Sequence, residues 1–396
     1  MLLALLVYSY CTSQFSSRQI ERASHSDVAV RFLCANTHPD HDTLCTFRRK
    51  NGALLQRAFA QILEMAARCG VFKVGQVTVA IDGTKVLANA SKHAAVSYGH
   101  AEQKLQELDL EIQELLAKAE QADSAPLQEG LTIPEEIQRR QERQAALRRA
   151  RAEMEARAYA RFQAESASFE AKMERRQSAE ESEKKPRGRA PQAPSAAPEA
   201  KDQVNFTDEE SRIMKTKDGF QQCYNAQAGV DTDSRLILGQ RVSQSPNDKQ
   251  ELAEDLKVVK ENASPAVVLI DSGFVSESTV VKIESENPGL QVLAAMERQP
   301  HGRTVKQLEK CPEPEPPGAD ADFATRMKYR TTTAGRTLYK LRQQTVEPIF
   351  GIIKEAMGFR RFSLRGHAKV SLEWNLVCLA YNLKLLHIVG ANLRAA

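Results

Sequence analysis

The chain has 396 residues, of which 42% are hydrophobic and 27% are charged. This composition indicates a globular chain long enough for two or three packed units, and it excludes collagen-like, fully disordered and disulfide-stapled classes. The odd number of cysteines, seven, indicates a reducing compartment rather than a secreted disulfide framework. The net charge of +4 is too small to identify a partner, so its distribution along the chain becomes the informative quantity.

The chain begins with an apolar run, Met1–Val7, that could be mistaken for the core of a signal peptide. No basic residue precedes this run, no small-residue cleavage site follows it closely, and it is too short to span a bilayer. We therefore expect a truncated helix or a core helix. No later run approaches the roughly 18 apolar residues of a transmembrane helix, so we expect a cytoplasmic protein with no membrane partner.

Residues 1–72 are predicted to be helical. Ser16 can cap one helix, and Pro39–Thr43 can cap a second, which carries the basic run Phe47–Lys50. Two short helices with a basic second helix are typical of a small DNA-binding module. A helical subdomain that merely packs on the rest of the chain is an equal alternative.

Two residue types in this segment also suggest a metal. A zinc cluster could form from Cys34, His38, His41 and Cys45. Their spacing is not that of a common zinc finger, however, and the segment from His38 to His41 suits a turn and a helix cap. We therefore favour the structural interpretation.

The middle of the chain changes pattern twice. Alternating residues between Gln76 and Leu87 predict a strand that ends at the acidic Asp82. Residues 101–122 have heptad spacing, and a capping box at Thr132–Glu135 opens a second long helix that extends to about Arg176, so we expect a helical hairpin. Residues 135–183 hold eleven basic and eleven acidic side chains, which indicates a solvated arm with a structural or oligomerisation role. The segment 184–203 is rich in Pro, Ala and Lys and is predicted to be a disordered linker.

Strands return after the linker. A hairpin is predicted from Gly219–Val230 and Arg235–Val242, followed by a helix that opens at Ser245–Asp248. The apolar run Ala266–Ile270 indicates a buried central strand that stops at Asp271. A helix at 276–286, a strand at 290–295, a Pro-rich loop at 311–317 and two C-terminal helices complete an α/β or α+β core. Trp374 could stack on a flipped base, but the apolar helix around it favours a place in the core.

Three acidic residues form the candidate catalytic site. Asp82 and Asp271 each end a predicted strand and are closely followed by glycine, which leaves space for a ligand beside a carboxylate. Glu347 lies in a basic helix. Three converging carboxylates can hold two Mg²⁺ ions, with Mn²⁺ as a substitute, and such ions promote displacement at a phosphodiester.

The distribution of charge agrees with a nucleic-acid substrate. Residues 326–369 contain eleven Lys or Arg and two acids, a net charge of +9 around Glu347, whereas the rest of the chain sums to −5. A basic cluster of this size beside a metal site suits a polyphosphate backbone and predicts salt-dependent binding.

Several ordered motifs together resemble the bacterial insertion-sequence transposases of the DDE class. The motifs are Asp82–Lys85, Ala88–Ser91, Arg212–Lys215, Tyr224–Gln227, Pro246–Lys249, Asp271–Phe274, Val346–Gly351, Arg360–Phe362 and Arg365–Gly366. The resemblance covers most of the chain, from about Leu2 to Leu386. It implies an α/β fold with a ribonuclease H-like mixed-sheet core, an inserted helical hairpin and an N-terminal all-helical subdomain.

The resemblance also implies roles for individual residues. Asp82, Asp271 and Glu347 would be the catalytic and metal-binding triad. Tyr339, Arg342 and Lys354 correspond to the Tyr-Arg-Glu-Lys signature of the family, although four residues separate Arg342 from Glu347 where three are usual. Contacts to DNA are expected from Tyr339, Arg342, Lys354, Arg360, Arg361, Arg365 and Lys85.

The expected activity is that of a transposase that binds the terminal inverted repeats of its element, cuts phosphodiester bonds with divalent metal and joins the 3′-hydroxyl ends to target DNA. It would act as a homo-oligomer at the nucleoid. The alternatives are a ribonuclease H-like nuclease without strand transfer and an inactive relative that only binds DNA. Relatives usually carry a further helical stretch before the segment that begins at Leu2, so the resemblance implies a chain that is either N-terminally shortened or wrongly started at Met1.

The expected organisation follows from these assignments. A helical subdomain with a candidate DNA-binding role occupies residues 1–72, and the first part of the catalytic core occupies 73–100. The hairpin arm at 101–183 and the linker at 184–203 follow. The remainder of the core, with the C-terminal helices, occupies 204–390.

Overall fold

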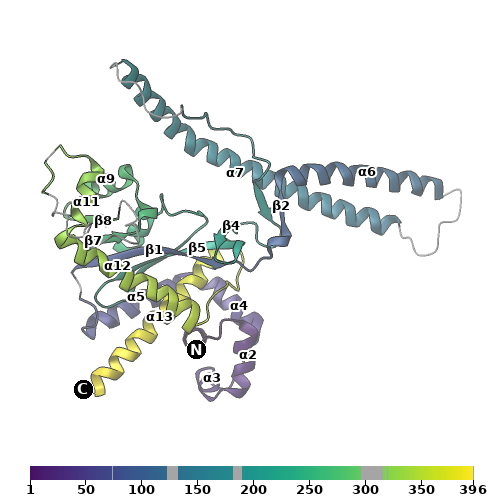
Figure 1. Cartoon of the computed structure of the whole chain (residues 1–396). Helices are drawn as coiled ribbons and strands as arrows, with labels where there is room; N and C mark the ends of the chain where they lie inside the picture. The colour runs from purple at the N-terminus through teal and green to yellow at the C-terminus, as the bar shows by residue number, and fades with distance from the viewer. Residues whose placement is uncertain (74, 123–132, 182–189, 296–314, 319, 396) are drawn as a thin grey trace. The chain divides into compact units, whose positions relative to one another are not determined.

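The computed structural model describes residues 1–395 except 74, 123–132, 182–189, 296–314 and 319 (Figure 1). It divides into two compact units, one formed by Met1–Asn89 and Met214–Ala396 and the other by Ala90–Ile213. The second unit is inserted in the sequence of the first. It is longer at both ends than the expected arm, because two short strands that flank the arm pair with each other.

The first unit is built on a mixed sheet. Its strands are β1 (Gln76–Leu87), β4 (Arg212–Thr216), β5 (Gly219–Asp231), β6 (Ile237–Ser243), β7 (Ser264–Ile270) and β8 (Gln291–Ala294). β5 pairs antiparallel with both β1 and β6, and β4 lies next to β5. On its other side β1 pairs parallel with β7, which pairs parallel with β8. The predicted hairpin, the buried strand ending at Ile270 and the mixed α/β class are thereby confirmed.

Helices cover both faces of this sheet. They are α8 (Leu252–Lys260), α9 (Glu277–Glu286), α11 (Phe323–Arg330), α12 (Thr333–Gly351) and α13 (His367–Ala395), with short turns η2 (Ser272–Phe274) and η3 (Ile352–Ala356). Val259 of α8 packs against Gly229, the partner of Ile81 in the β1–β5 register. Arg342 of α12 instead contacts the next residue of β1, Asp82. Since neighbouring residues of a strand point to opposite faces, α8 and α12 lie on opposite faces of the sheet.

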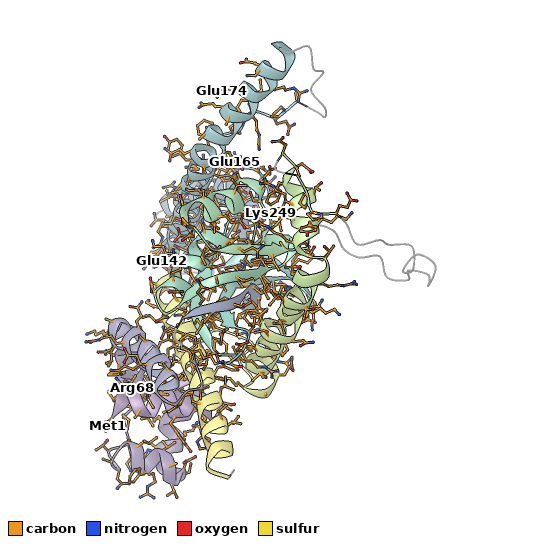
Figure 2. All side chains as sticks on the ribbon, turned by 90° about the vertical axis from the view of Figure 1, so that its left-hand side faces the viewer. Met1, Arg68, Glu142, Glu165, Glu174 and Lys249 are labelled. Atoms are coloured by element: carbon orange, nitrogen blue, oxygen red, sulfur yellow. The ribbon has the colours of Figure 1, made fainter. Side chains whose placement is uncertain are left out.

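The N-terminal part of the first unit is helical, as predicted. Its helices are α1 (Leu2–Cys11), α2 (Ser17–Ser26), α3 (Val28–Leu33), α4 (His41–Lys50) and α5 (Gly52–Arg68). Asp40 caps α4 by accepting a hydrogen bond from Thr43 N at 2.6 Å, which confirms the predicted cap. The first apolar run is a buried helix, and α1 and α5 both pack against α13. Figure 2 shows Met1 and Arg68 on these helices, next to the C-terminal helix.

The second unit contains two long helices. Its elements are η1 (Lys92–Ala94), β2 (Ala95–Ser97), α6 (Tyr98–Ala122), α7 (Ile133–Glu181) and β3 (Gln203–Asn205). The helices lie side by side in Figure 1 and run antiparallel, because Tyr98 bonds to Glu155 while Glu111 bonds to Arg140. Leu105 and Leu108 of the heptad seam are buried against α7. The proposed cap at Thr132 lies outside the described residues.

Three expectations about boundaries differ from the structure. β1 does not end at Asp82 but continues to Leu87, because β5 remains paired with it after β7 has ended. α8 begins at Leu252, later than expected. The end of the expected linker is held in place, because Asp202 forms an ion pair with Arg161 at 3.0 Å and accepts a backbone hydrogen bond from Tyr98.

Two further expectations concern the Pro-rich loop and membrane-spanning helices. The Pro-rich loop lies largely outside the described residues. Among the residues that the structure describes, no helix is both long and apolar enough to cross a membrane.

Candidate active site

The strands β1 and β7 bring two of the expected acids together. Ala80 lies opposite Leu269 in the parallel register, and the same register continued by two residues sets Asp82 beside Asp271. Both aspartates therefore lie at the carboxyl end of the parallel pair. A sequence pattern could identify each strand end, but the pairing of the two strands required the fold.

Asp82 is the most buried member of this group. Its side chain is 19% exposed, and its Oδ1 accepts a hydrogen bond from Gly83 N at 2.8 Å. Burial raises the pKa of Asp82 to about 6, and the nearby Asp271 and Asp248 add to the effect, while the Gly83 N–H and the Arg342 guanidinium oppose it. The ionised form of the Asp82 carboxylate is therefore unfavourable by itself, and a nearby positive charge would stabilise it.

Arg342 supplies positive charge to all three acids. Its Nη1 lies 3.1 Å from Asp82 Oδ2, and its Nη2 lies 3.0 Å from Glu347 Oε1 and 3.7 Å from Asp271 Oδ1. The Arg342 side chain is only 7% exposed, whereas those of Asp271 and Glu347 are about half exposed. The structure thus brings the three expected carboxylates together around one guanidinium. We call Asp82, Asp271, Glu347 and Arg342 the acidic cluster.

Arg342 and Tyr339 contact protein groups where the resemblance led us to expect DNA. Arg342 is buried in the acidic cluster, because α12 carries it directly over Asp82. The hydroxyl of Tyr339 donates to the carbonyl of Ile270 at 3.3 Å, immediately before Asp271. Burial raises the pKa of Tyr339. Both residues hold the site together within the protein.

The remaining basic residues border the end of β1. Lys354 Nζ donates to Thr84 Oγ1 at 2.6 Å and to the carbonyl of Lys85 at 2.8 Å, and burial lowers the pKa of Lys354. Burial also lowers the pKa of Lys85 itself. The backbone of Arg360–Phe362 bonds to Leu87 and so extends the edge of β1.

Three exposed arginines follow this edge. Arg360 pairs with Glu355, and Arg365 donates through Nε to the carbonyl of Asn89 at 3.0 Å. Arg361 forms no ion pair with any residue that the structure describes. These arginines are therefore placed on the surface of the first unit beside the strand that carries Asp82.

A polar network on the α8 face was not assigned a role from the sequence. Asn225 and Gln227 both donate to Asp248 Oδ1, at 2.6 and 2.8 Å, and both amides are buried. Gln227 lies opposite Gly83, where an added Cβ would be 2.7 Å from its Oε1. The motifs that contain these residues were visible in the sequence, but their meeting across the sheet was not.

The other candidate ligands do not converge. Cys34 donates to the carbonyl of Arg31, His38 bonds to Ser24, His41 bonds to Glu21, and Cys45 bonds to Ser17. Trp374 is fully buried and donates to the carbonyl of Gln227 at 3.0 Å, which confirms its place in the core.

The acidic cluster matches the donor chemistry of a divalent metal. Its carboxylate oxygens are the hard ligands that Mg²⁺ and Mn²⁺ prefer. Within the described ranges, however, no three His, Cys, Asp or Glu side chains are arranged as metal ligands. Each member of the triad instead contacts Arg342. The three carboxylates are thus the type of ligand that a divalent metal needs, and in this structure the Arg342 guanidinium supplies the positive charge between the carboxylates.

The fold and the cluster define a class. In the mixed sheet, β6, β5 and β1 are antiparallel, and β7 and β8 continue it in parallel. The three acids lie on β1, directly after β7 and on a covering helix. This arrangement is a ribonuclease H-like DDE core. Such cores act on nucleic-acid phosphodiesters.

Comparison with family models shows to which family within this class the chain belongs. A model described as Transposase DDE domain matches residues 189–383, and one described as Transposase domain (DUF772) matches residues 1–50. The chain belongs to the DDE transposases of insertion sequences. No curated protein and no solved structure matches it significantly. Since the DDE match begins after Asp82, the assignment of that residue depends on its position beside Asp271.

Proposed function

We propose that this transposase cuts phosphodiester bonds at the ends of its mobile element and joins the freed 3′-hydroxyl groups to target DNA. The observation that carries the proposal is the meeting of Asp82, Asp271 and Glu347 around Arg342, where the parallel pairing of β1 with β7 ends. Membership of the DDE family supports the reaction class.

Each residue of the site has a proposed task. Asp82 and Asp271 hold two Mg²⁺ ions, with Mn²⁺ as a substitute, and Glu347 completes the set of ligands. When bound, the ions would lower the pKa of the attacking water or hydroxyl and would stabilise the negative charge that develops on the leaving oxygen. Tyr339 fixes the carbonyl just before Asp271, so that this carboxylate keeps its position at the sheet edge.

DNA binding is assigned to the basic surface near the end of β1. Arg360, Arg361 and Arg365 are exposed and lie next to the segment that follows Asp82, which supports a role in contacting phosphates. Lys85 and Lys354 are half-buried and would contact DNA from beneath. The DNA partners are the terminal inverted repeats and the target, and the protein would act as a homo-oligomer at the nucleoid.

The proposal is tested with the DNA that flanks the gene. Duplexes of this flanking DNA are incubated with Mg²⁺ and with wild type, Asp271→Asn, Glu347→Gln or Glu355→Gln. We expect both triad variants to retain DNA binding and to lose strand cutting, because each loses a charged ligand. Glu355→Gln is the matched control, since it removes an exposed carboxylate outside the acidic cluster. Unchanged cutting by either triad variant would contradict the proposal.

A second arm separates transposition from simple cleavage. Pre-cut ends with a free 3′-hydroxyl are supplied together with a target plasmid, and joined products are measured. Joining supports a transposase. Cutting without joining would identify a ribonuclease H-like nuclease, and salt-sensitive binding with neither reaction would identify an inactive DNA-binding relative.

A further inference from the structure

The position of Arg342 within the acidic cluster has a consequence for metal binding. Its guanidinium lies within 3.7 Å of one oxygen from each of Asp82, Asp271 and Glu347. These are the oxygens that the proposed function assigns to divalent cations. A divalent cation and the Arg342 guanidinium would therefore bind the same three carboxylates.

We propose that Arg342 is a positioning residue that assembles the three carboxylates before metal binds and competes with the metal for them. This inference rests on the proposed function, because it takes the triad to be the metal site. Three carboxylates that met without a counter-charge would repel one another, and the partly buried Asp82 would be unfavourable as an anion. One guanidinium relieves this repulsion and still leaves a net negative charge that attracts a divalent ion.

The burial of the cluster shows from which side a cation would arrive. Arg342 is 7% exposed and Asp82 is 19% exposed, whereas Asp271 is 49% exposed and Glu347 is 52% exposed. Arg342 and Asp82 are thus the buried part of the cluster, and Asp271 and Glu347 are its solvent-exposed part. An entering ion would first meet Asp271 and Glu347, and it would displace the guanidinium from them without having to remove Arg342 from the protein.

The hydrogen bonds of Arg342 indicate that its contacts are replaceable. Its Nε is buried and has no hydrogen-bond partner among the residues that the structure describes, and its contact with Asp271 is longer than a hydrogen bond. A buried donor without a partner is unfavourable. The guanidinium is therefore held by the negative charge of the carboxylates rather than by a complete set of hydrogen bonds, which is the behaviour of a charge that another cation can replace.

The test measures Mn²⁺ binding to the full chain without DNA, by the loss of the electron paramagnetic resonance signal of free Mn²⁺. We expect Arg342→Gln to bind Mn²⁺ about tenfold more tightly than wild type, because a competitor for the same oxygens is removed. The variant should also unfold at a lower temperature than wild type in EDTA. By linkage, saturating Mn²⁺ should raise its unfolding temperature by more than it raises that of wild type.

Two further variants make the result specific. Arg330→Gln removes a guanidinium that pairs with Glu284 elsewhere in the first unit, so it controls for general destabilisation and should leave Mn²⁺ affinity unchanged. Arg342→Lys retains the charge but not the fork that reaches several carboxylates, and it should bind Mn²⁺ more tightly than wild type, though less tightly than Arg342→Gln. If Arg342→Gln does not fold, the Mn²⁺ affinity of Arg342→Lys tests the competition instead.

The inference and the proposed function fail in different ways. Equal or weaker Mn²⁺ binding by Arg342→Gln, or by the Lys variant where it decides, would overturn the competition. Glu347→Gln tests the site itself and should weaken Mn²⁺ binding at least tenfold. If Glu347→Gln leaves Mn²⁺ affinity unchanged, the metal is not held by the triad, and the proposed function fails whatever Arg342 does.

Discussion

A buried ion pair joins the N-terminal helices to the catalytic core, and its removal gives the sharpest prediction about stability. Arg48 of α4 lies 3.9 Å from Glu373 of α13, and their side chains are 2% and 0% exposed. Arg48 also donates to the Tyr10 hydroxyl at 2.6 Å. Glu373 accepts backbone hydrogen bonds from Ser363 and Leu364, next to the exposed Arg365. The pair thus connects the helices matched by the N-terminal family model with the basic edge beside the active site.

We expect Arg48→Met to lower the free energy of unfolding by about 3 kcal/mol. Removing one partner of a buried ion pair typically costs about 3–5 kcal/mol. The lower end applies here, because Glu373 keeps its backbone hydrogen bonds and the charges are not in closest contact. Burial raises the pKa of Glu373, and Arg48 opposes this effect.

The pH dependence of this loss has a definite sign. Without Arg48 the folded-state pKa of Glu373 moves further above its unfolded value. A carboxyl with a raised folded-state pKa binds its proton more tightly when folded, so stability falls as pH rises from the unfolded pKa through the folded one. The cost of Arg48→Met should therefore be larger at pH 8 than at pH 5.

Urea unfolding followed by tryptophan fluorescence measures this loss. Trp374 is the single tryptophan of the chain and is buried beside Phe350 and Phe359, so its signal reports unfolding of the first unit. The double variant Arg48→Met with Glu373→Gln should recover at least about 1 kcal/mol relative to the sum of the single losses. A loss below about 1 kcal/mol for Arg48→Met, or strict additivity in the double variant, would refute the reasoning.

Three further predictions each concern a single residue. Gly83→Ala should lower the stability by about 1–3 kcal/mol in the same fluorescence assay, because the new methyl group would press on the buried Gln227; an unchanged midpoint would contradict this. Arg361→Ala should reduce the slope of log DNA affinity against log salt by about one, whereas Arg330→Ala, whose guanidinium is already paired, should not. Burial raises the pKa of Asp255 to about 7, so the contribution of Asp255 to stability falls as pH rises from 4 to 7. Unfolding curves should therefore show Asp255→Asn gaining stability relative to wild type over that range, and a constant difference would argue against it.

The sequence predicted the parts of the fold that depend on local patterns. The alternation before Asp82 and the apolar run before Asp271 define strands, and Asp40 defines a helix cap, because each signal lies within a few neighbouring residues. The end of β1 could not be predicted, since it is set by β5, which lies far along the chain. The position of Gln227 against Gly83 depends on the same pairing.

The place of Arg342 shows most clearly where sequence reasoning stops. The spacing of the signature identified Arg342, but a spacing does not reveal whether a side chain points outward to a phosphate or inward to carboxylates. That choice is made by packing, because α12 contacts β1 and brings Arg342 to 3.1 Å from Asp82.

The orientation of the signature residues also limits where DNA can be held. Arg342 and Tyr339 are engaged with the acidic cluster and with β7, and Lys354 is engaged with β1. A phosphate that reached Arg342 would have to compete with three carboxylates, which is unfavourable unless divalent cations already neutralise them. Metal binding would therefore free Arg342 for DNA, whereas exposed residues such as Arg361 can bind phosphate without metal. On this view, affinity for DNA should increase when Mg²⁺ is present in wild type and should lose that increase in Arg342→Gln.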